Sequence, residues 1–169
     1  MKKVIEKLGR FEETVLALSL LGLALLTFVE TALRYTVSYT FIWFQEFSNY
    51  MIVFTTFLGA SVATKYVMHF SMEAVTQYAP DRVSHLLKTT GYFISGIVVL
   101  LFVYFGTLHV MALRGFGVTS AAMQIPMFVP YLPIPLFSLV MSFRFFRLAY
   151  KHLQGFLNNE PFEKVVRRD

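Results

Sequence analysis

The sequence predicts an all-α membrane protein with four transmembrane helices and both chain ends in the cytoplasm. Hydrophobic residues make up 56% of the 169 residues and charged residues only 15%, whereas about a quarter of a typical soluble domain is charged. The uncharged residues gather into four runs, each close to the length with which an apolar helix crosses about 30 Å of hydrocarbon. Most Lys and Arg residues fall in the segments that would lie on one side of the membrane if the four runs cross it in turn.

The four runs define the expected spans. Stretches without Asp, Glu, Lys or Arg cover 14–29, 47–64, 89–113 and 119–143. The first two are short, but side chains at their ends can reach the interface and extend them. We therefore expect spans at about 13–34, 44–66, 88–113 and 120–147, within a single membrane domain covering 1–169. Four such runs leave too little polar sequence to solvate a soluble globule.

The orientation follows from the basic residues, because Lys and Arg in short loops stay in the cytoplasm. Thirteen of the fifteen fall before the first span, between the second and third, or after the fourth, and only Arg34 and Arg114 fall in the other two segments. Both termini are therefore expected inside. The net charge of +5 needs no nucleic acid, since contact with anionic lipid accounts for it.

The segment before the first span, residues 1–13, is expected to form an amphipathic lead-in helix. Its apolar residues recur at helical spacing and share one side: Val4, Ile5, Leu8 and Phe11. Such a helix lies at the membrane surface. The first span is expected to be retained, because acidic residues interrupt the leading basic segment and residues 31–34 lack the small-x-small pattern of a signal-peptide cleavage site.

Prolines mark the fourth span as bent or broken in its outer half. They stand at Pro126, Pro130, Pro133 and Pro135. Each removes a backbone donor and disfavours α geometry in the preceding residue. The segment 114–119 is so short that the third and fourth spans must form an antiparallel hairpin.

The sparse polar groups cluster at the outer ends of the first two spans. Glu30 and Arg34 are spaced i, i+4, so their side chains can meet on one helix face; they are either a partner-facing pair or an interfacial salt bridge. Glu46 follows Trp43 at the start of the second span and is either partner-facing or an acidic residue favoured by the helix dipole.

Small residues in the second span permit a close helix contact. Gly59 and Ala63 stand four apart, a spacing that lets two helices approach within the membrane, in this chain or with a partner. Lys65, Arg144 and Arg147 at the inner ends are expected to fix the topology and contact lipid, with Lys65 snorkelling to the surface.

The residues favour no catalytic chemistry and no cofactor. There is no cysteine, and of four histidines only His109 lies inside a span, so a bis-His haem lacks its second ligand. His69 and Glu73 are too few for a metal site. A carrier working alone usually has an inverted pair of broken helices, which this chain lacks. It is expected to be a subunit of a larger assembly.

The order of these features resembles the small, four-helix (DctQ-like) membrane subunit of tripartite ATP-independent periplasmic (TRAP) transporters over nearly the whole chain. The resemblance is carried by Glu30-x-x-x-Arg34, Trp43-x-x-Glu46, the run 57–60 (FLGA), His69 with Glu73, Pro80 with Arg82, and the Ile-Pro pairs at 125–126 and 134–135. The sequence departs from the family pattern at two places. Many members have paired acids after the Trp, where this chain has Gln45 and Glu46, and the aromatic residue that often follows the first Ile-Pro pair is delayed to Phe128.

The resemblance implies a non-catalytic subunit that works with two partners, a large elevator-type membrane subunit and a periplasmic binding protein. It also implies sodium-coupled import of an organic anion of the sialic-acid or C4-dicarboxylate class, across the bacterial inner membrane, with the sialic-acid systems most similar. This chain would be a scaffold that helps to dock the binding protein. The alternatives are a membrane anchor of a redox enzyme complex and a self-assembling small channel or carrier.

Overall fold

The computed structural model describes residues 2–66 and 80–158, and these residues form helices without a β-strand. The helices are α1 (Lys2–Thr36), α2 (Phe44–Tyr66), α4 (Asp81–Phe116), α5 (Phe128–Tyr131) and α6 (Pro133–Leu157). Four stretches are long and apolar enough to cross a membrane: Gly9–Thr36, Phe44–Tyr66, Val83–Phe116 and Phe128–Leu157. The predicted all-α fold with four spans is confirmed.

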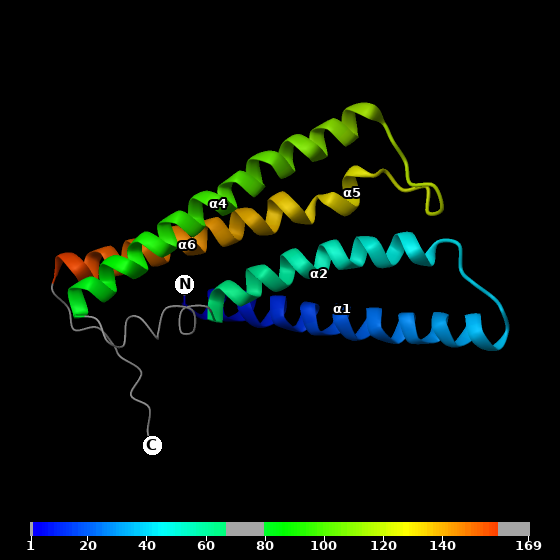
Figure 1. The fold of residues 1–169 in the computed structure, drawn as a ribbon, viewed down its shortest axis with the longest axis horizontal. Coiled ribbons are helices and arrows are strands. Elements are labelled where there is room, and N and C mark those ends of the chain that lie inside the picture. Colours follow the sequence, from blue (N-terminus) through cyan, green and yellow to red (C-terminus); the bar gives the residue numbers. More distant parts are fainter. Residues whose placement is uncertain (1, 67–79, 159–169) are drawn as a thin grey trace, which may run out of the picture.

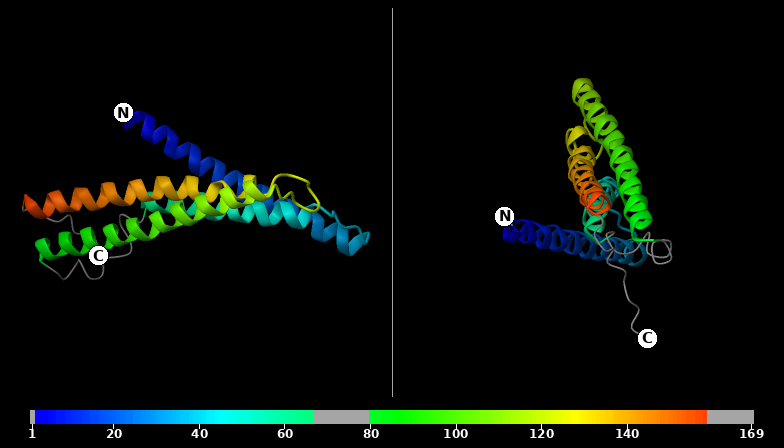
Figure 2. Two further views of the ribbon diagram at one scale, coloured as in Figure 1. Left: turned by 90° about the horizontal axis from the view of Figure 1, so that it is seen from above. Right: turned by 90° about the vertical axis from the view of Figure 1, so that its left-hand side faces the viewer.

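The helices form two antiparallel hairpins, α1 with α2 and α4 with α6 (Figure 1). The main packing joins α1 to α2, α2 to α6, and α6 to α4, while the short α5 lies against α2 and α4. Figure 2 shows α1 crossing the other helices at an angle, so that its N-terminal end projects away from them. The result is an open row with α1 and α4 at its edges.

The row has two ends, which we name by their contents. At the basic end, α1 and α4 begin and α2 and α6 end. At the loop end lie the connections 37–43 and 117–127. The expected lead-in is the first part of α1, which runs as one helix from Lys2. The segment between α2 and α4, residues 67–79, lies outside the described residues, and so do His69 and Glu73 within it.

Small residues bring α4 and α6 together. A Cβ atom on Gly96 would stand 3.1 Å from the Phe146 ring, and one on Gly106 would stand 3.0 Å from Cγ2 of Ile134. Ser142 on α6 also donates a hydrogen bond of 3.4 Å to the Gly96 carbonyl. Because lipid tails are as apolar as Leu, such close packing, and not burial of apolar surface, holds membrane helices together.

The proline-rich segment is broken where the sequence predicted. The helix α4 ends at Gly117 in the left-handed conformation, which glycine adopts without strain. The chain then makes one antiparallel bridge between Thr119 and Pro126, forms the four-residue α5, and restarts as α6 at Pro133. Proline suits the first helical turn because its missing N–H has no partner there. The fourth span thus begins at Phe128 and extends to Leu157, later than the expected 120–147.

Three threonine hydroxyls inside the spans bond to their own helices. Thr27, Thr55 and Thr107 donate to the carbonyls four residues earlier, at 2.7, 2.8 and 2.7 Å. This back-bonding satisfies a hydroxyl where no water is present. These side chains therefore need no partner from solvent or solute.

Candidate functional site

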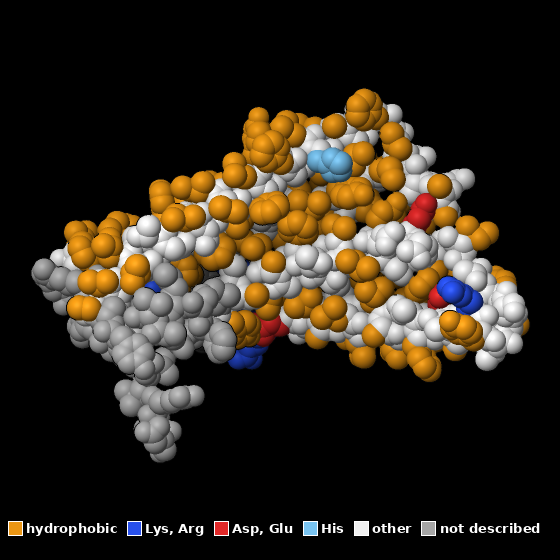
Figure 3. All heavy atoms as spheres, viewed as in Figure 1, with side chains coloured by type: hydrophobic (Ala, Val, Ile, Leu, Met, Phe, Trp, Pro, Cys, Tyr) orange, Lys and Arg blue, Asp and Glu red, His pale blue; other side chains and the backbone are white. Residues whose placement is uncertain are grey.

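Charged side chains in the described helices lie in two layers. Glu13 and Glu30 bound the uncharged part of α1, and Glu46 and Lys65 bound that of α2. At 1.5 Å per residue these pairs are about 26 and 28 Å apart, close to the thickness of the hydrocarbon core. On the face shown in Figure 3, charged atoms lie near the helix ends and hydrophobic atoms cover the middle. The candidate sites are therefore the two ends.

At the loop end, Glu46 holds the connection 117–127. Its two carboxylate oxygens accept hydrogen bonds from the backbone N–H groups of Ala122 and Met123, both at 3.0 Å. Bonds to a charged acceptor are stronger than neutral ones. Within this connection Ser120 is buried and Gln124 has a positive φ of 54°. Glu46 thus ties the first turn of α2 to the loop between α4 and α5.

Glu30 and Arg34 are not paired with each other. Glu30 is only 9% exposed, whereas Arg34 is exposed, and neither belongs to an ion pair among the described residues. The Arg34 guanidinium instead lies 5.8 Å from the centroid of the Tyr35 ring. The i, i+4 spacing places the two residues on one side of the helix without joining them.

Trp43 belongs to an aromatic cluster just before α2. Its ring centroid lies 5.7 Å from that of Phe41, 6.4 Å from that of Phe44 and 5.9 Å from that of Phe47. The indole is 40% exposed. An amphipathic ring at the end of a span suits the level of the lipid headgroups.

At the basic end, Glu12 joins three helices. Its carboxylate oxygens each lie 2.9 Å from Nη2 of Arg144 on α6, and Oε2 lies 3.0 Å from Nζ of Lys65 on α2. Lys65 also donates to the Gly9 carbonyl at 2.7 Å. Nη1 of Arg144 donates to the Ser61 carbonyl and, at 3.0 Å, to the Ser61 hydroxyl. We call Glu12, Lys65, Arg144 and Ser61 the polar clamp.

The sequence contained no signal for the polar clamp, since Glu12 and Arg144 are 132 positions apart. Lys65 and Arg144 were interpreted as topology and lipid residues; the structure places both against Glu12. Gly59 faces α1 within this chain, where its Cβ position lies 3.6 Å from Cδ1 of Leu16. Ala63 is exposed.

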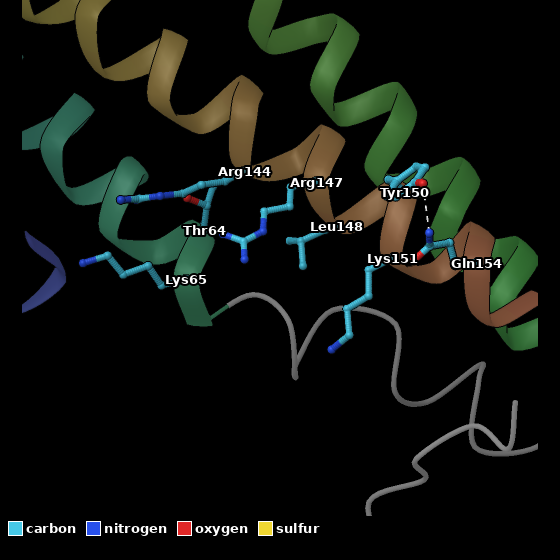
Figure 4. Close-up of a pocket in the computed structure, with 8 residues that line it drawn as sticks. All are labelled: Thr64, Lys65, Arg144, Arg147, Leu148, Tyr150, Lys151 and Gln154. Carbon is cyan, nitrogen blue, oxygen red and sulfur yellow. Dashed lines mark hydrogen bonds between the residues drawn. The ribbon is translucent and has the colours of Figure 1, made fainter. Parts of the chain in front are cut away.

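Beside the polar clamp lies a basic pocket between α2 and α6, with a cavity of about 540 Å³. Figure 4 shows the side chains that line it: Thr64, Lys65, Arg144, Arg147, Leu148, Tyr150, Lys151 and Gln154. Arg147 and Lys151 are exposed and belong to no ion pair among the described residues. No carboxylate lines the pocket on the described part of the chain.

Two histidines that the sequence did not single out meet at the same end. Nδ1 of His85 on α4 lies 3.4 Å from Nδ1 of His152 on α6, and the His152 ring stacks on Tyr92 at 5.6 Å. A Cβ atom on Gly155 would stand 2.7 Å from the His85 ring. The glycine therefore makes room for the imidazole between the two helices.

Comparison with known proteins assigns the family. The family model described as "Tripartite ATP-independent periplasmic transporters, DctQ component" matches residues 23–155. The ectoine TRAP transporter small permease protein TeaB of Halomonas elongata is 23% identical, covering 86% of this chain and 76% of that protein. The C4-dicarboxylate TRAP transporter small permease protein DctQ of Vibrio cholerae is 22% identical, covering 90% of this chain and 77% of that protein. The chain therefore belongs to the DctQ component family of TRAP transporters, and it is a small membrane subunit of a transporter, not an enzyme.

Proposed function

We propose that this chain is a static scaffold for the large membrane subunit of its transporter. The large subunit moves an organic anion with sodium, and a periplasmic binding protein delivers that anion. As a family member with four apolar helices, the chain is a multi-pass protein of a bacterial inner membrane. The observation that carries the proposal is the pair of charge layers about 26 to 28 Å apart, with no Asp, Glu, Lys or Arg between them on α1 and α2.

The edge helices support the scaffold role. On α1, Leu18, Leu21, Leu25 and Phe28 are more than half exposed and recur at the i, i+3, i+7 spacing of one helix face. On α4 the same spacing joins exposed residues from Ile94 to Met111. A stripe of this kind suits packing against a helix of a large partner in the membrane.

The loop end is proposed to face the periplasm, because the distribution of Lys and Arg predicts that the opposite end and both termini lie in the cytoplasm. Glu30, Arg34, Trp43 and Glu46 then lie on the side where a binding protein docks. Glu30 is buried, and the exposed Arg34 forms no ion pair within the described part of the chain; this supports a contact that a partner completes. Glu46 contributes by fixing the adjoining loop.

The transported substrate is proposed to be an organic anion of the sialic-acid or C4-dicarboxylate class. One relative carries the C4-dicarboxylate name and the other the ectoine name. Because relatives of similar identity bear different substrate names, the selective contacts are proposed to lie in the partner subunits.

Copurification in mild detergent tests the scaffold role. A tagged chain coexpressed with the large subunit should retain it, and Glu30→Gln or Arg34→Gln should reduce both retention and sodium-dependent uptake. Arg114→Gln is the matched control, since Arg114 is exposed and closes α4 at the loop end. Wild-type retention and uptake in both test variants would overturn the assignment of these residues.

A haem or flavin spectrum in the purified material would favour the redox anchor, and solute flux through the chain alone would favour the small channel.

A further inference from the structure

The basic pocket has charge left over after the polar clamp forms. Lys65 and Arg144 are bound to Glu12, and Lys65 also lies 3.5 Å from Glu13. Arg147 and Lys151 have no such acidic partner on the described chain and stand one turn apart on α6. Two unneutralised cations therefore line a cavity of about 540 Å³ at the level where a span ends. An anion is the chemical complement of this pocket.

The surface next to the pocket is apolar. Toward the loop end, α6 exposes Leu136, Leu139 and Phe143, and a groove of about 530 Å³ lies between α4 and α6 against Leu100, Leu139, Val140, Ser142, Phe143 and Phe146. Leu136 lies about 16 Å from Arg147 along the helix, which is close to half the hydrocarbon thickness. The apolar surface thus has the length of one acyl chain of a lipid in one leaflet.

We propose that the basic pocket binds the phosphate headgroup of an anionic phospholipid. Arg147 and Lys151 contact the phosphodiester, and one acyl chain follows Phe143, Leu139 and Leu136. Arginine suits this ligand because its planar guanidinium matches the geometry of phosphate oxygens. The hydroxyl of Tyr150, which accepts a hydrogen bond of 2.9 Å from Nε2 of Gln154, forms part of the polar wall (Figure 4). The apolar groove favours a lipid over free phosphate, because free phosphate has no apolar part that could bind in the groove.

The test measures lipid binding to the purified full chain. The chain is titrated with dioleoyl-phosphatidylglycerol, and native mass spectrometry detects the bound lipid. Dioleoyl-phosphatidylcholine and inorganic phosphate serve as the comparison ligands. The double variant Arg147→Gln/Lys151→Gln should bind phosphatidylglycerol about 30-fold more weakly, because each basic residue near a membrane surface contributes about 1 kcal/mol. The matched control is Arg10→Gln, an exposed basic residue of α1 at the same end but outside the pocket, and it should weaken binding by less than about fivefold.

The proposal predicts one tightly held phosphatidylglycerol, weak binding of phosphatidylcholine, and no displacement by inorganic phosphate. Wild-type binding by the double variant, or an equal loss in Arg10→Gln, would overturn it, since the effect would then be the general charge of the basic end. Displacement of the lipid by phosphate at similar concentration would also overturn it in favour of a free-phosphate site. Circular dichroism melting of both variants checks that they fold.

Discussion

Replacing Glu12 by Gln removes the charge at the centre of the polar clamp. The substitution keeps the size of the side chain but leaves Arg144 and Lys65 facing each other across a neutral amide. Their ion pairs with the carboxylate, at 2.9 and 3.0 Å, are then lost, because the amide oxygen of Gln is a neutral acceptor. Arg144 keeps its bonds to Ser61, and Lys65 keeps the Gly9 carbonyl.

The burial of the three side chains sets the expected magnitude. Glu12 is 13% exposed, Lys65 21% and Arg144 22%, between a fully exposed and a fully buried ion pair. Exposed pairs contribute about 0.2–1 kcal/mol, whereas breaking a buried pair costs about 3–5 kcal/mol. We therefore expect Glu12→Gln to lower the free energy of unfolding by about 2–3 kcal/mol, with a fall in Tm of about 4–12 °C.

Two measurements test this expectation. Thermal melting in mild detergent gives the change in stability. Since the chain contains no cysteine, Leu18→Cys and Leu153→Cys can be spin-labelled without competition, and both positions are exposed on α1 and α6. The distance distribution between the labels should be narrow in the parent and broaden with Glu12→Gln, because Arg144 binds α1 to α6 through this carboxylate.

Glu13→Gln is the matched control. Glu13 is 39% exposed and lies 3.5 Å from Lys65, so its substitution should cost under about 1 kcal/mol. Equal effects of the two substitutions on the free energy of unfolding, within about 0.5 kcal/mol, would refute the reasoning, because the stability of α1 would then not depend on Glu12. An unchanged distance distribution in Glu12→Gln would do the same.

Two further substitutions test the other contacts. Glu46→Gln should speed hydrogen exchange at the amides of Ala122 and Met123 about 10- to 100-fold, because a bond to a charged acceptor contributes about 1.5–3 kcal/mol. The control is Gln45→Ala, since Gln45 is exposed. Equal exchange rates in the two variants would contradict the role of Glu46. Gly155→Ala should destabilise the pairing of α4 with α6 by about 1–3 kcal/mol, since its Cβ atom would stand 2.7 Å from the His85 ring. Gly22→Ala is the control: nothing lies within 4 Å of its Cβ position, so it should instead stabilise α1 by about 0.5–1 kcal/mol. A Gly155→Ala variant as stable as the parent would show that the His85 ring can move aside.

The spans could be predicted from the sequence because they depend on local composition. An apolar run must form a helix in hydrocarbon, where every backbone group needs an internal partner, and a proline must interrupt it. The break between α4 and α6 followed from the prolines. The position of α6 was less predictable: its last turns, with Lys151 and Gln154, are polar in sequence and continue the helix to Leu157 beyond the apolar run.

The contacts at the two ends could not be predicted, because they join residues distant in the sequence. Glu46 at the first turn of α2 fitted a dipole interaction, yet its partners are backbone amides 76 and 77 positions away. Lys65 fitted a snorkelling cation, and its partner is Glu12 in another helix. Spacing within a helix shows which side chains share a face, as for Glu30 and Arg34, but it does not establish that they touch.

The end contacts matter because hydrocarbon gives the helices no hydrophobic reason to associate. The pair α4 and α6 has Gly96, Gly106 and the Ser142 hydrogen bond along its length. By contrast, α1 has the Gly59 contact with Leu16 and the polar clamp near its beginning, while its outer face stays exposed. Loss of the clamp should therefore loosen α1 before α4 or α6. In the proposed assembly, a large subunit packed on the exposed stripe of α1 would replace part of the lost stabilisation, so Glu12→Gln should lower Tm less in the complex than in the chain alone.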